Sequence, residues 1–242
     1  MVFTSISFFG TKNQHQSKIN NNTDKKYSDG DGNPSVINDS DVNIKKATNV
    51  FELLLLNCQG LTTEKTDYIF TEYITNNRNL KFLCLTEIWQ SEESIGSKVF
   101  EDFNISASYI RKKFIHGGVG IWSHTDLKVK PLLLDQFCIE KDIEICGISY
   151  IDSTKTNHMI LTCYRSPCGN LSTFCDHIEK ILNQIWKPKT ILTLTGDFNL
   201  DPIRDIKQYT LLNNILNTFD LKNIINKPTR GEYILDHIYI YQ

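Results

Sequence analysis

Three hydrophobic segments of strand length stand out along the chain, and each leads to a polar side chain. They cover residues 50–57, 80–85 and 190–195, and they are almost continuous in aliphatic and β-branched residues. Such a run is typical of a strand buried on both faces, because a strand with one wet face would alternate. The polar side chains at the ends of the three predicted strands are Asn57, Glu87 and Asp197.

Residues 103–164 have a different pattern, with short hydrophobic segments separated by turn residues. The predicted strands are 105–110, 118–123, 127–131, 143–150 and 158–164, with turn signals at 116–118 and 152–157. This spacing predicts one largely antiparallel sheet. The block ends at Tyr164 and Arg165, which either reach a phosphate or edge the sheet.

Apolar residues three and four apart predict three helices, starting near residue 63, covering 172–186 and starting near residue 205. Ser172 is a candidate N-cap of the second helix. Asp205 with Gln208 three residues later resembles a capping box at the start of the third helix. Residues 233–240 form the last predicted strand.

The amino-terminal segment is polar. Residues 10–47 are dominated by Asn, Asp, Lys, Ser and Gly and have almost no aliphatic side chain to bury. Such a segment cannot offset the entropy of ordering, so we expect residues 1–48 to be a disordered tail. One domain then covers residues 49–242.

Composition narrows the classes of protein and of partner. The chain has 242 residues, of which 40% are hydrophobic and 22% charged, and its formal net charge is −2. This balance excludes a uniformly basic surface, although a local basic patch is sufficient for phosphate contact. Seven cysteines without a paired Cys-x-x-Cys indicate reduced thiols, and no apolar run is long enough to span a bilayer. We therefore expect an intracellular, soluble protein without a membrane partner.

The side chains at the strand ends are candidates for a functional site. Catalytic groups gather beyond the carboxyl ends of core strands, because the sheet fixes the backbone while the loops stay open. Asn57, Glu87 and Asp197 would converge if their strands are neighbours. The Asp197 loop also carries Asn199. The sequence Gly-Asp-x-Asn also forms an ordinary turn, since Asp and Asn cap nearby backbone amides.

Five short motifs in order give the chain a resemblance to a known family. They are LNCQG at 56–60, LTEIW at 85–89, CYRSP at 163–167, GDFN at 196–199, and a segment that runs from PTR at 228–230 through LD at 235–236. With these motifs, residues 49–242 resemble the endonuclease/exonuclease/phosphatase family, and most of all the endonuclease domains of non-LTR retrotransposons. The resemblance implies an α/β fold of the α+β type, in which two packed mixed β-sheets are flanked by helices in four layers.

The resemblance assigns metal and water roles to four residues. Glu87 resembles the principal Mg²⁺ ligand of the family, with Mn²⁺ as an alternative ion, and Asn57 resembles the residue that assists metal and phosphate placement. One carboxylate, one amide and a substrate phosphate suit Mg²⁺, which prefers oxygen ligands and keeps several waters. Asp197 matches the residue that orients or deprotonates the attacking water, and Asn199 matches one that hydrogen-bonds near the phosphate.

Four further residues are assigned to the substrate by the same resemblance. Tyr164 matches a tyrosine that contacts the scissile phosphate, and Asp236 resembles the aspartate that orients a catalytic histidine. Thr229 resembles a residue of the loop that shapes the DNA site. Arg165 matches a contact to the DNA backbone phosphates.

The implied activity is hydrolysis of a DNA phosphodiester by in-line attack of water, leaving 3′-hydroxyl and 5′-phosphate ends. Charge on the phosphate oxygens would be stabilised by the metal and by positioned donors. In a retrotransposon the nick primes reverse transcription, so the resemblance implies DNA as partner, a reverse transcriptase in the parent protein and action in the nucleus.

The sequence departs from the family at its carboxyl end. The family places a final Ser-Asp-His after the strand that carries the equivalent of Asp236, and this sequence has no Ser-Asp-His. We therefore expect the domain to be incomplete, with its closing strand missing. His237 directly follows Asp236, and strand alternation turns it to the opposite face.

Three alternative functions are compatible with this departure. The first is a nicking endonuclease, and the second is a truncated, inactive remnant that at most binds Mg²⁺ or DNA. The third is a phosphoesterase that acts on a lipid or inositol phosphate. The context of Trp89, Tyr164 and Arg165 favours the retrotransposon branch.

Overall fold

The computed structural model describes residues 4–7, 52–98 and 100–241 of the chain. One of its two sheets has five strands in the order β1-β2-β3-β5-β4. These strands are β1 (Thr4–Ser7), β2 (Glu52–Asn57), β3 (Leu80–Thr86), β5 (Val119–His124) and β4 (Phe103–Tyr109). β2 and β3 run parallel, and the other neighbours run antiparallel.

The second sheet has six strands in the order β10-β11-β9-β8-β7-β6. They are β10 (Leu221–Asn223), β11 (Asp236–Tyr241), β9 (Thr190–Asp197), β8 (Asn157–Tyr164), β7 (Glu144–Ile151) and β6 (Val129–Pro131). β8 and β9 are parallel, and the remaining pairs are antiparallel. Both sheets are therefore mixed, as expected from the sequence.

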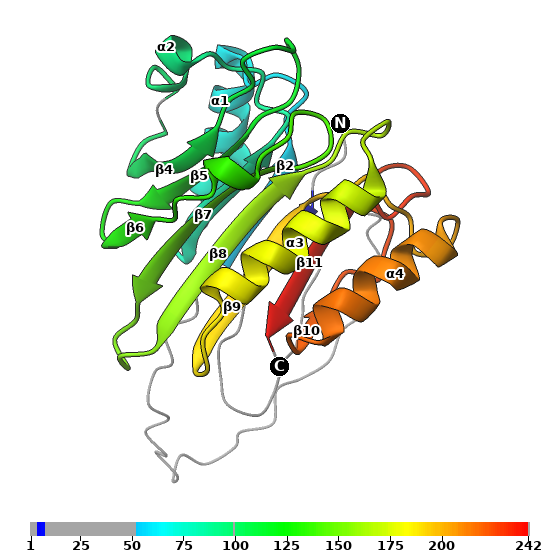
Figure 1. Ribbon diagram of the computed structural model, residues 1–242. Coiled ribbons are helices and arrows are strands. Elements are labelled where there is room, and N and C mark those ends of the chain that lie inside the picture. The colour runs from blue at the N-terminus through cyan, green and yellow to red at the C-terminus, as the bar shows by residue number, and fades with distance from the viewer. Residues whose placement is uncertain (1–3, 8–51, 99, 242) are drawn as a thin grey trace, which may run out of the picture.

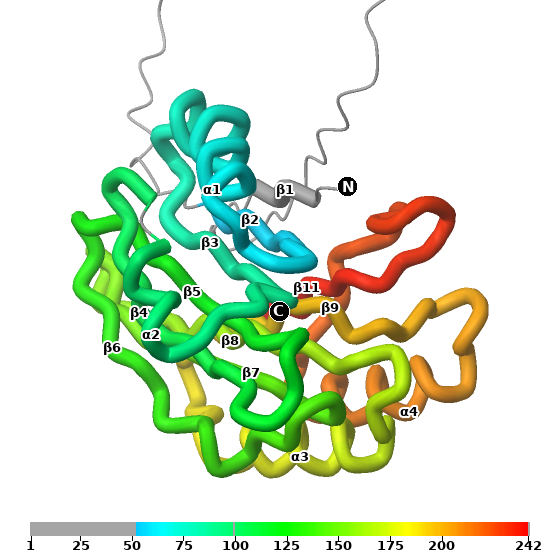
Figure 2. The backbone as a smooth tube through the Cα atoms, turned by 90° about the horizontal axis from the view of Figure 1, so that it is seen from above, coloured from blue at the N-terminus to red at the C-terminus, as the bar shows by residue number. Residues whose placement is uncertain are grey.

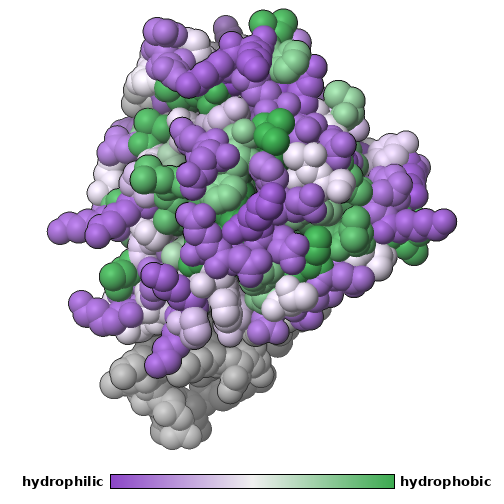
Figure 3. Space-filling model, viewed as in Figure 1, coloured by the Kyte–Doolittle hydropathy of each residue, from purple (hydrophilic) through white to green (hydrophobic). Residues whose placement is uncertain are grey.

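Helices cover the outer faces of the two sheets (Figure 1). On the five-stranded sheet lie α1 (Thr63–Ile69), its π-helical continuation η1 (Phe70–Ile74) and the short α2 (Glu92–Ile95). On the six-stranded sheet lie α3 (Leu171–Ile185) and α4 (Ile206–Asn217), with the 3₁₀ turn η2 (Asp135–Phe137) near the start of β7. The face seen in Figure 3, which carries α3 and α4, is mostly hydrophilic. Helix, sheet, sheet and helix form the four expected layers.

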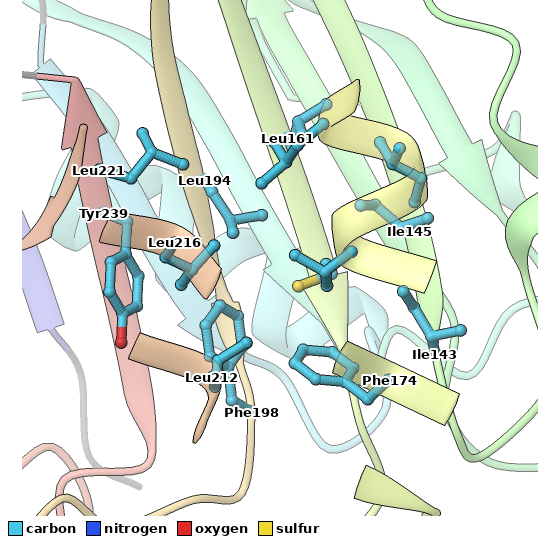
Figure 4. Packing of buried hydrophobic residues seen from close by; sticks show 14 of the residues in the cluster. Ile143, Ile145, Leu161, Phe174, Leu194, Phe198, Leu212, Leu216, Leu221 and Tyr239 are labelled. Atoms are coloured by element: carbon cyan, nitrogen blue, oxygen red, sulfur yellow. The ribbon is translucent and has the colours of Figure 1, made fainter. Parts of the chain in front are cut away.

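Side-chain alternation divides the core into three layers. On β2, Leu53 and Leu55 pack between the two sheets, whereas Leu54 and Leu56 pack toward α1. This confirms that the described part of the hydrophobic run, residues 52–57, is a strand buried on both faces. The largest cluster lies between the six-stranded sheet and the pair α3 and α4, where Phe174 meets Phe198 with ring centroids 5.4 Å apart (Figure 4).

The predicted single antiparallel sheet over residues 103–164 is wrong. β4 and β5 belong to the five-stranded sheet, and β6, β7 and β8 belong to the six-stranded sheet. The turn signals define where strands end, but β5 pairs with β3, which lies outside the block. Local sequence therefore identified the strands and could not assign their partners.

Two helix starts also differ from the prediction. Asn170, and not Ser172, caps α3, because its side chain accepts a hydrogen bond from the Thr173 amide. Asp205 precedes α4 without a side-chain cap, since its carboxylate accepts a hydrogen bond from the Asp201 amide. The Asp205 side chain therefore closes the preceding loop instead of capping the helix.

The ends of the chain differ in two further ways. Residues Thr4–Ser7, inside the predicted tail, form β1 and pair with β2; the rest of that tail lies outside the described residues. The last strand begins at Asp236 and not at 233, because residues 229–233 form a turn closed by the Arg230–Tyr233 bridge. Within the described segments, no helix has the length and apolarity needed to cross a membrane.

Candidate active site

Three of the predicted site residues point between the two sheets at the same end of the molecule. Ile160 and Tyr164 on β8 face the inter-sheet core, as do Ile238 and Ile240 on β11, so alternation places Asp236 on that face as well. On β9, Leu192 and Leu194 face α3 and α4, which leaves Asp197 on the inter-sheet side.

Asn57 joins the two sheets at this end. Its Nδ2 donates to Glu87 Oε1 at 2.7 Å and to Asp197 Oδ2 at 2.6 Å. Asn57 and Glu87 belong to the ends of β2 and β3 in one sheet, whereas Asp197 ends β9 in the other. The predicted convergence of the three side chains is therefore confirmed, although Asp197 comes from the facing sheet.

The orientation of Asn57 refines its predicted role. Its Oδ1 accepts a hydrogen bond from the Gln59 amide at 3.0 Å, and its Nδ2 faces the two carboxylates. A ligand to Mg²⁺ must present oxygen, whereas Asn57 in this arrangement presents Nδ2 and is a donor that holds Glu87 and Asp197 together. Glu87 remains the candidate ligand.

Asp197 is fully buried and has a single cationic partner, Arg230. Arg230 Nη2 lies 2.7 Å from Asp197 Oδ2 and 3.7 Å from Asp236 Oδ1. Burial raises the pKa of the Asp197 carboxyl above its ordinary range, although Arg230 and Asn57 oppose the shift. Asp197 is therefore a stronger base than a solvated aspartate.

Asp236 lies directly opposite Asp197 in the antiparallel register of β11 and β9. Burial and the neighbouring Asp197 charge raise the pKa of Asp236 to about 7, and Arg230 and Thr229 act in the other direction. Two buried carboxyl groups on directly paired residues repel each other when both are ionised, so the second loses its proton less readily than the first. Asp197 receives the closer hydrogen bonds, so we assign the negative charge to Asp197 and the retained proton to Asp236.

Thr229 fixes the backbone next to the pair Asp197 and Asp236. It is buried, and its hydroxyl accepts hydrogen bonds from the amides of Leu235 and Asp236, both at 3.1 Å. The structure therefore places Thr229 at the base of the loop that carries Arg230. Its role there is to fix the start of β11 and the Asp236 carboxyl.

Left-handed backbone is concentrated in the loops around the site. Gln59, Glu87, Trp89 and Asn199 have φ values of 45°, 49°, 52° and 47°. Non-glycine residues seldom adopt this conformation, and strain of this kind is common where a loop positions functional groups. At Glu87 the left-handed residue ends the alternation of β3.

Asn199 and Arg165 form a buried brace beside the site. Asn199 Nδ2 donates to Arg165 O at 2.8 Å, and Arg165 Nη2 donates to Asn199 O at 2.7 Å. Arg165 also donates through Nε to Phe198 O and through Nη1 to Gly169 O, and it is only 5% exposed.

The predicted phosphate contact of Arg165 does not agree with this arrangement. A guanidinium committed to backbone carbonyls is not free to bind phosphate. Arg165 instead locks the loop after Asp197 to the loop after Tyr164. The side-chain amide of Asn199 is likewise turned to Arg165, whereas its backbone amide donates to Asp197 Oδ1 at 3.1 Å.

Tyr164 is buried at the end of β8. Burial and the nearby Glu87 carboxylate raise the pKa of its phenol, so the hydroxyl stays protonated and can donate a hydrogen bond. Beside it, Arg111 forms a buried ion pair with Glu144 and donates to Ser166 Oγ at 2.8 Å. The Arg111 guanidinium lies 5.7 Å from the Tyr164 ring, so this network supports the tyrosine.

His237 lies on the helix side of β11, as strand alternation predicts. It is fully buried, with Nε2 2.9 Å from Leu200 O and Nδ1 3.0 Å from Asn223 Nδ2. Burial lowers the pKa of the imidazole to about 4, so it is neutral at pH 7. It therefore does not take the position of a catalytic histidine.

The donors at the site fit one hydrated divalent cation. The described residues contain no group of three His, Cys, Asp or Glu side chains arranged around a metal position. Mg²⁺ commonly binds through one or two carboxylates, substrate phosphate and several waters. The half-buried Glu87 carboxylate, which Asn57 orients, meets this requirement. The described residues do not form the cage of three or four protein ligands that is typical of zinc.

Arg230 is the site residue that sequence reasoning missed. It stands in the PTR motif beside Thr229, but the motif gave no reason to pair it with a carboxylate 33 residues earlier. The sequence feature that could have identified it is an arginine, Arg230, in the loop just before the predicted strand that carries Asp236. Only the fold shows that this arginine is the cation facing three convergent carboxylates.

Comparison with solved structures shows the fold. The endonuclease domain of TRAS1, a telomere-specific non-LTR retrotransposon, has a TM-score of 0.59 and 15% identity, covering 79% of this chain and 85% of that chain. An endonuclease/exonuclease/phosphatase from Bacteroides vulgatus has a TM-score of 0.59 at 12% identity, with 78% and 86% covered. D. rerio TDP2 in complex with single-strand DNA product has a TM-score of 0.55 at 11% identity, with 79% and 83% covered.

No family model matches the sequence, and no curated protein matches it. The resemblance found from the five motifs therefore agrees with the structural neighbours, which have the endonuclease/exonuclease/phosphatase fold. At these identities the likeness shows the fold alone.

Proposed function

We propose that this chain is an endonuclease/exonuclease/phosphatase family enzyme that hydrolyses DNA phosphodiesters with a divalent cation. One observation carries the proposal: Asn57 Nδ2 joins Glu87 and Asp197 across two sheets, at 2.7 and 2.6 Å. Tyr164, Asp236 and Arg230 come to the same place from three further segments. Phosphodiester hydrolysis requires a carboxylate that can hold a cation, a base and hydrogen-bond donors to the phosphate. Glu87, Asp197 and the pair Tyr164 and Arg230 can supply these groups.

The residues divide the work of the reaction. Asp197, with its raised pKa, accepts a proton from the attacking water, and Asn57 orients its carboxylate. As the water oxygen bonds to phosphorus, the bond from phosphorus to the 3′-oxygen breaks, and that oxygen leaves as a hydroxyl group with a proton from solvent water. Tyr164 donates a hydrogen bond to a phosphate oxygen, and Arg230 supplies positive charge beside it. A cation held by Glu87, Mg²⁺ or Mn²⁺, would polarise the phosphate and offset its charge.

The biological setting is part of the proposal. A nick that leaves a 3′-hydroxyl would prime reverse transcription, as the TRAS1-like fold suggests, with the reverse transcriptase carried by the parent protein. This role would place the chain in the nucleus, with DNA as its partner.

The test is nicking of supercoiled plasmid by the purified protein with Mg²⁺, beside an EDTA reaction. Glu87→Ala and Asp197→Ala are expected to lower the rate by at least about a hundredfold, the usual effect of losing a positioned charge or base. Glu179→Ala is the matched control, because Glu179 is an exposed carboxylate on α3, away from the site.

Nicking that continues in EDTA, or that survives both substitutions, would contradict the proposal. Hydrolysis of phosphate monoesters or of lipid and inositol phosphates, without plasmid nicking, would assign the same site to a different substrate. The enzyme would then retain Glu87 and Asp197 in their roles.

A further inference from the structure

The loop between β4 and β5 is the most unusual exposed feature near the site. Residues 111–116 read Arg-Lys-Lys-Phe-Ile-His, with two large apolar side chains between cationic ones. Ile115 is 85% exposed and Phe114 is 43% exposed. What sets this loop apart is that two adjacent apolar side chains are exposed together between cationic ones, a combination that suits contact with a partner.

The loop is built into a fixed shape. The Glu140 carboxylate accepts hydrogen bonds from three consecutive amides, those of Lys112 at 2.7 Å, Lys113 at 3.0 Å and Phe114 at 3.0 Å. The ammonium of Lys141 lies 3.4 Å from the centroid of the Phe114 ring. The backbone beneath Ile115 is therefore held before any partner binds, which lowers the entropy cost of binding.

The loop is also tied to the candidate active site. His116 stacks on Trp89 with ring centroids 4.1 Å apart, and the Trp89 amide donates to Gly117 O at 2.9 Å. Trp89 is only two residues beyond Glu87. At the other end of the loop, Gly118 donates its amide to buried Glu144 at 2.6 Å. A partner that contacts Ile115 is thus placed beside the Glu87 carboxylate.

The positive charge of the loop favours an anionic partner. Lys112 is largely exposed and makes only a 3.9 Å pair with exposed Glu92. Neither Lys113 nor Lys141 forms an ion pair with any residue that the structure describes. The chain as a whole is slightly acidic, with a formal charge of −2, so this loop is a local basic patch.

A second cationic and aromatic pair lies on the opposite flank of the site. The Arg204 guanidinium stacks on Tyr233, 3.7 Å from the ring centroid. These residues belong to the loops after β9 and before β11, which are the orange and red loops on the right of Figure 2. The order β11-β9-β8-β7 and the pairing of β5 with β3 place the 111–116 loop on the other flank. Asp197 and Asp236 lie buried between the flanks.

We propose that the 111–116 loop is a duplex-DNA wedge, in which Lys112 and Lys113 bind backbone phosphates and Ile115 enters the groove between base steps. Proteins that kink DNA use apolar wedges flanked by cations in this way. A duplex that crosses both flanks would bring a phosphodiester down to the recessed carboxylates. The inference rests on the proposed function and specifies duplex DNA as the substrate.

The test measures binding of a 30-base-pair duplex by fluorescence anisotropy, with nicking of plasmid measured in parallel. Ile115→Ala is expected to weaken duplex binding about tenfold through loss of buried apolar area. The double variant Lys112→Ala and Lys113→Ala is expected to lower the slope of log K against log salt by about 2. Ile151→Ala is the matched control, because Ile151 is 66% exposed at the far end of β7.

A small diester separates the two proposals. Hydrolysis of bis(4-nitrophenyl) phosphate is expected to be unchanged in Ile115→Ala, because the loop does not supply the reacting groups. Duplex binding equal to wild type in Ile115→Ala would overturn the wedge, as would loss of binding to anionic phosphatidylserine vesicles with duplex binding intact. Duplex binding by a wild-type chain that cuts neither substrate would overturn the catalytic proposal and leave the wedge in place.

Discussion

Replacing Arg230 by methionine removes the cation that faces the buried carboxylates and keeps much of the apolar volume of the side chain. Asp197 is fully buried, and Arg230 Nη2 is 2.7 Å from its Oδ2. No other cationic side chain among the described residues forms an ion pair with Asp197. The substitution therefore leaves Asp197 with hydrogen bonds from Asn57 and the Asn199 amide but without a counter-charge.

The size of the effect follows from the geometry. Charges centred about 4 Å apart at an effective dielectric of about 20 attract by about 4 kcal/mol. The Arg230 side chain is 30% exposed, and water screening reduces this figure to roughly 2 kcal/mol. Since this attraction stabilises the ionised form of the carboxyl group, the pKa of Asp197 should rise further in Arg230→Met.

The assay is the rate of plasmid nicking between pH 6 and pH 9.5. A carboxylate with a higher pKa is already protonated at a higher pH, so the acid limb of the rate profile should move to higher pH. Arg230→Lys should move it less, because the charge is retained while the fork geometry is lost. Arg78→Met is the control, since Arg78 is exposed and precedes the start of β3, at the end opposite Glu87.

Two outcomes would refute this reasoning. An unchanged pH profile in Arg230→Met would mean that Arg230 does not set the ionisation of Asp197. An equal fall in rate at every pH would mean that Arg230 acts on the substrate phosphate, with no effect on the base.

Three further predictions concern stability, each measured by thermal unfolding. Asp236 has a folded pKa of about 7, above its unfolded value, so its stabilising contribution is present in acid and lost as pH rises from about 4 through 7; Asp236→Asn should therefore melt higher than wild type at pH 8, with the difference vanishing near pH 4. Gly196→Ala should destabilise by more than about 3 kcal/mol, because its φ is 151° and an added Cβ would lie 1.8 Å from Cys163 O; a wild-type melting temperature would contradict this. Thr195→Val should be neutral or stabilising by up to about 1 kcal/mol, since its buried hydroxyl has no hydrogen-bond partner among the described residues; a loss of more than that would reveal an unseen partner.

The strands that carry the site, and the direction of their side chains, could be predicted from local sequence. The continuous run before Asn57 and the aliphatic run before Glu87 are typical of strands buried on both faces, because a strand with one face in water would alternate. Strand alternation likewise fixed the opposite faces of Asp236 and His237, since side chains alternate with a period of two. These are local properties, and the structure agrees with them.

Which of these residues contact one another depends on the packing of the two sheets. Asp197 reaches Asn57 from a different sheet, 140 residues away, and no local pattern specifies that pairing. The same holds for Arg165, whose guanidinium was free to bind phosphate in the sequence but binds three backbone carbonyls in the fold. Arg230 had no predicted role, and packing made it the cation beside Asp197. Long-range contacts depend on how the two sheets stack. Residue type and spacing are therefore sufficient to identify candidate residues, but the contacts between them follow from the packing.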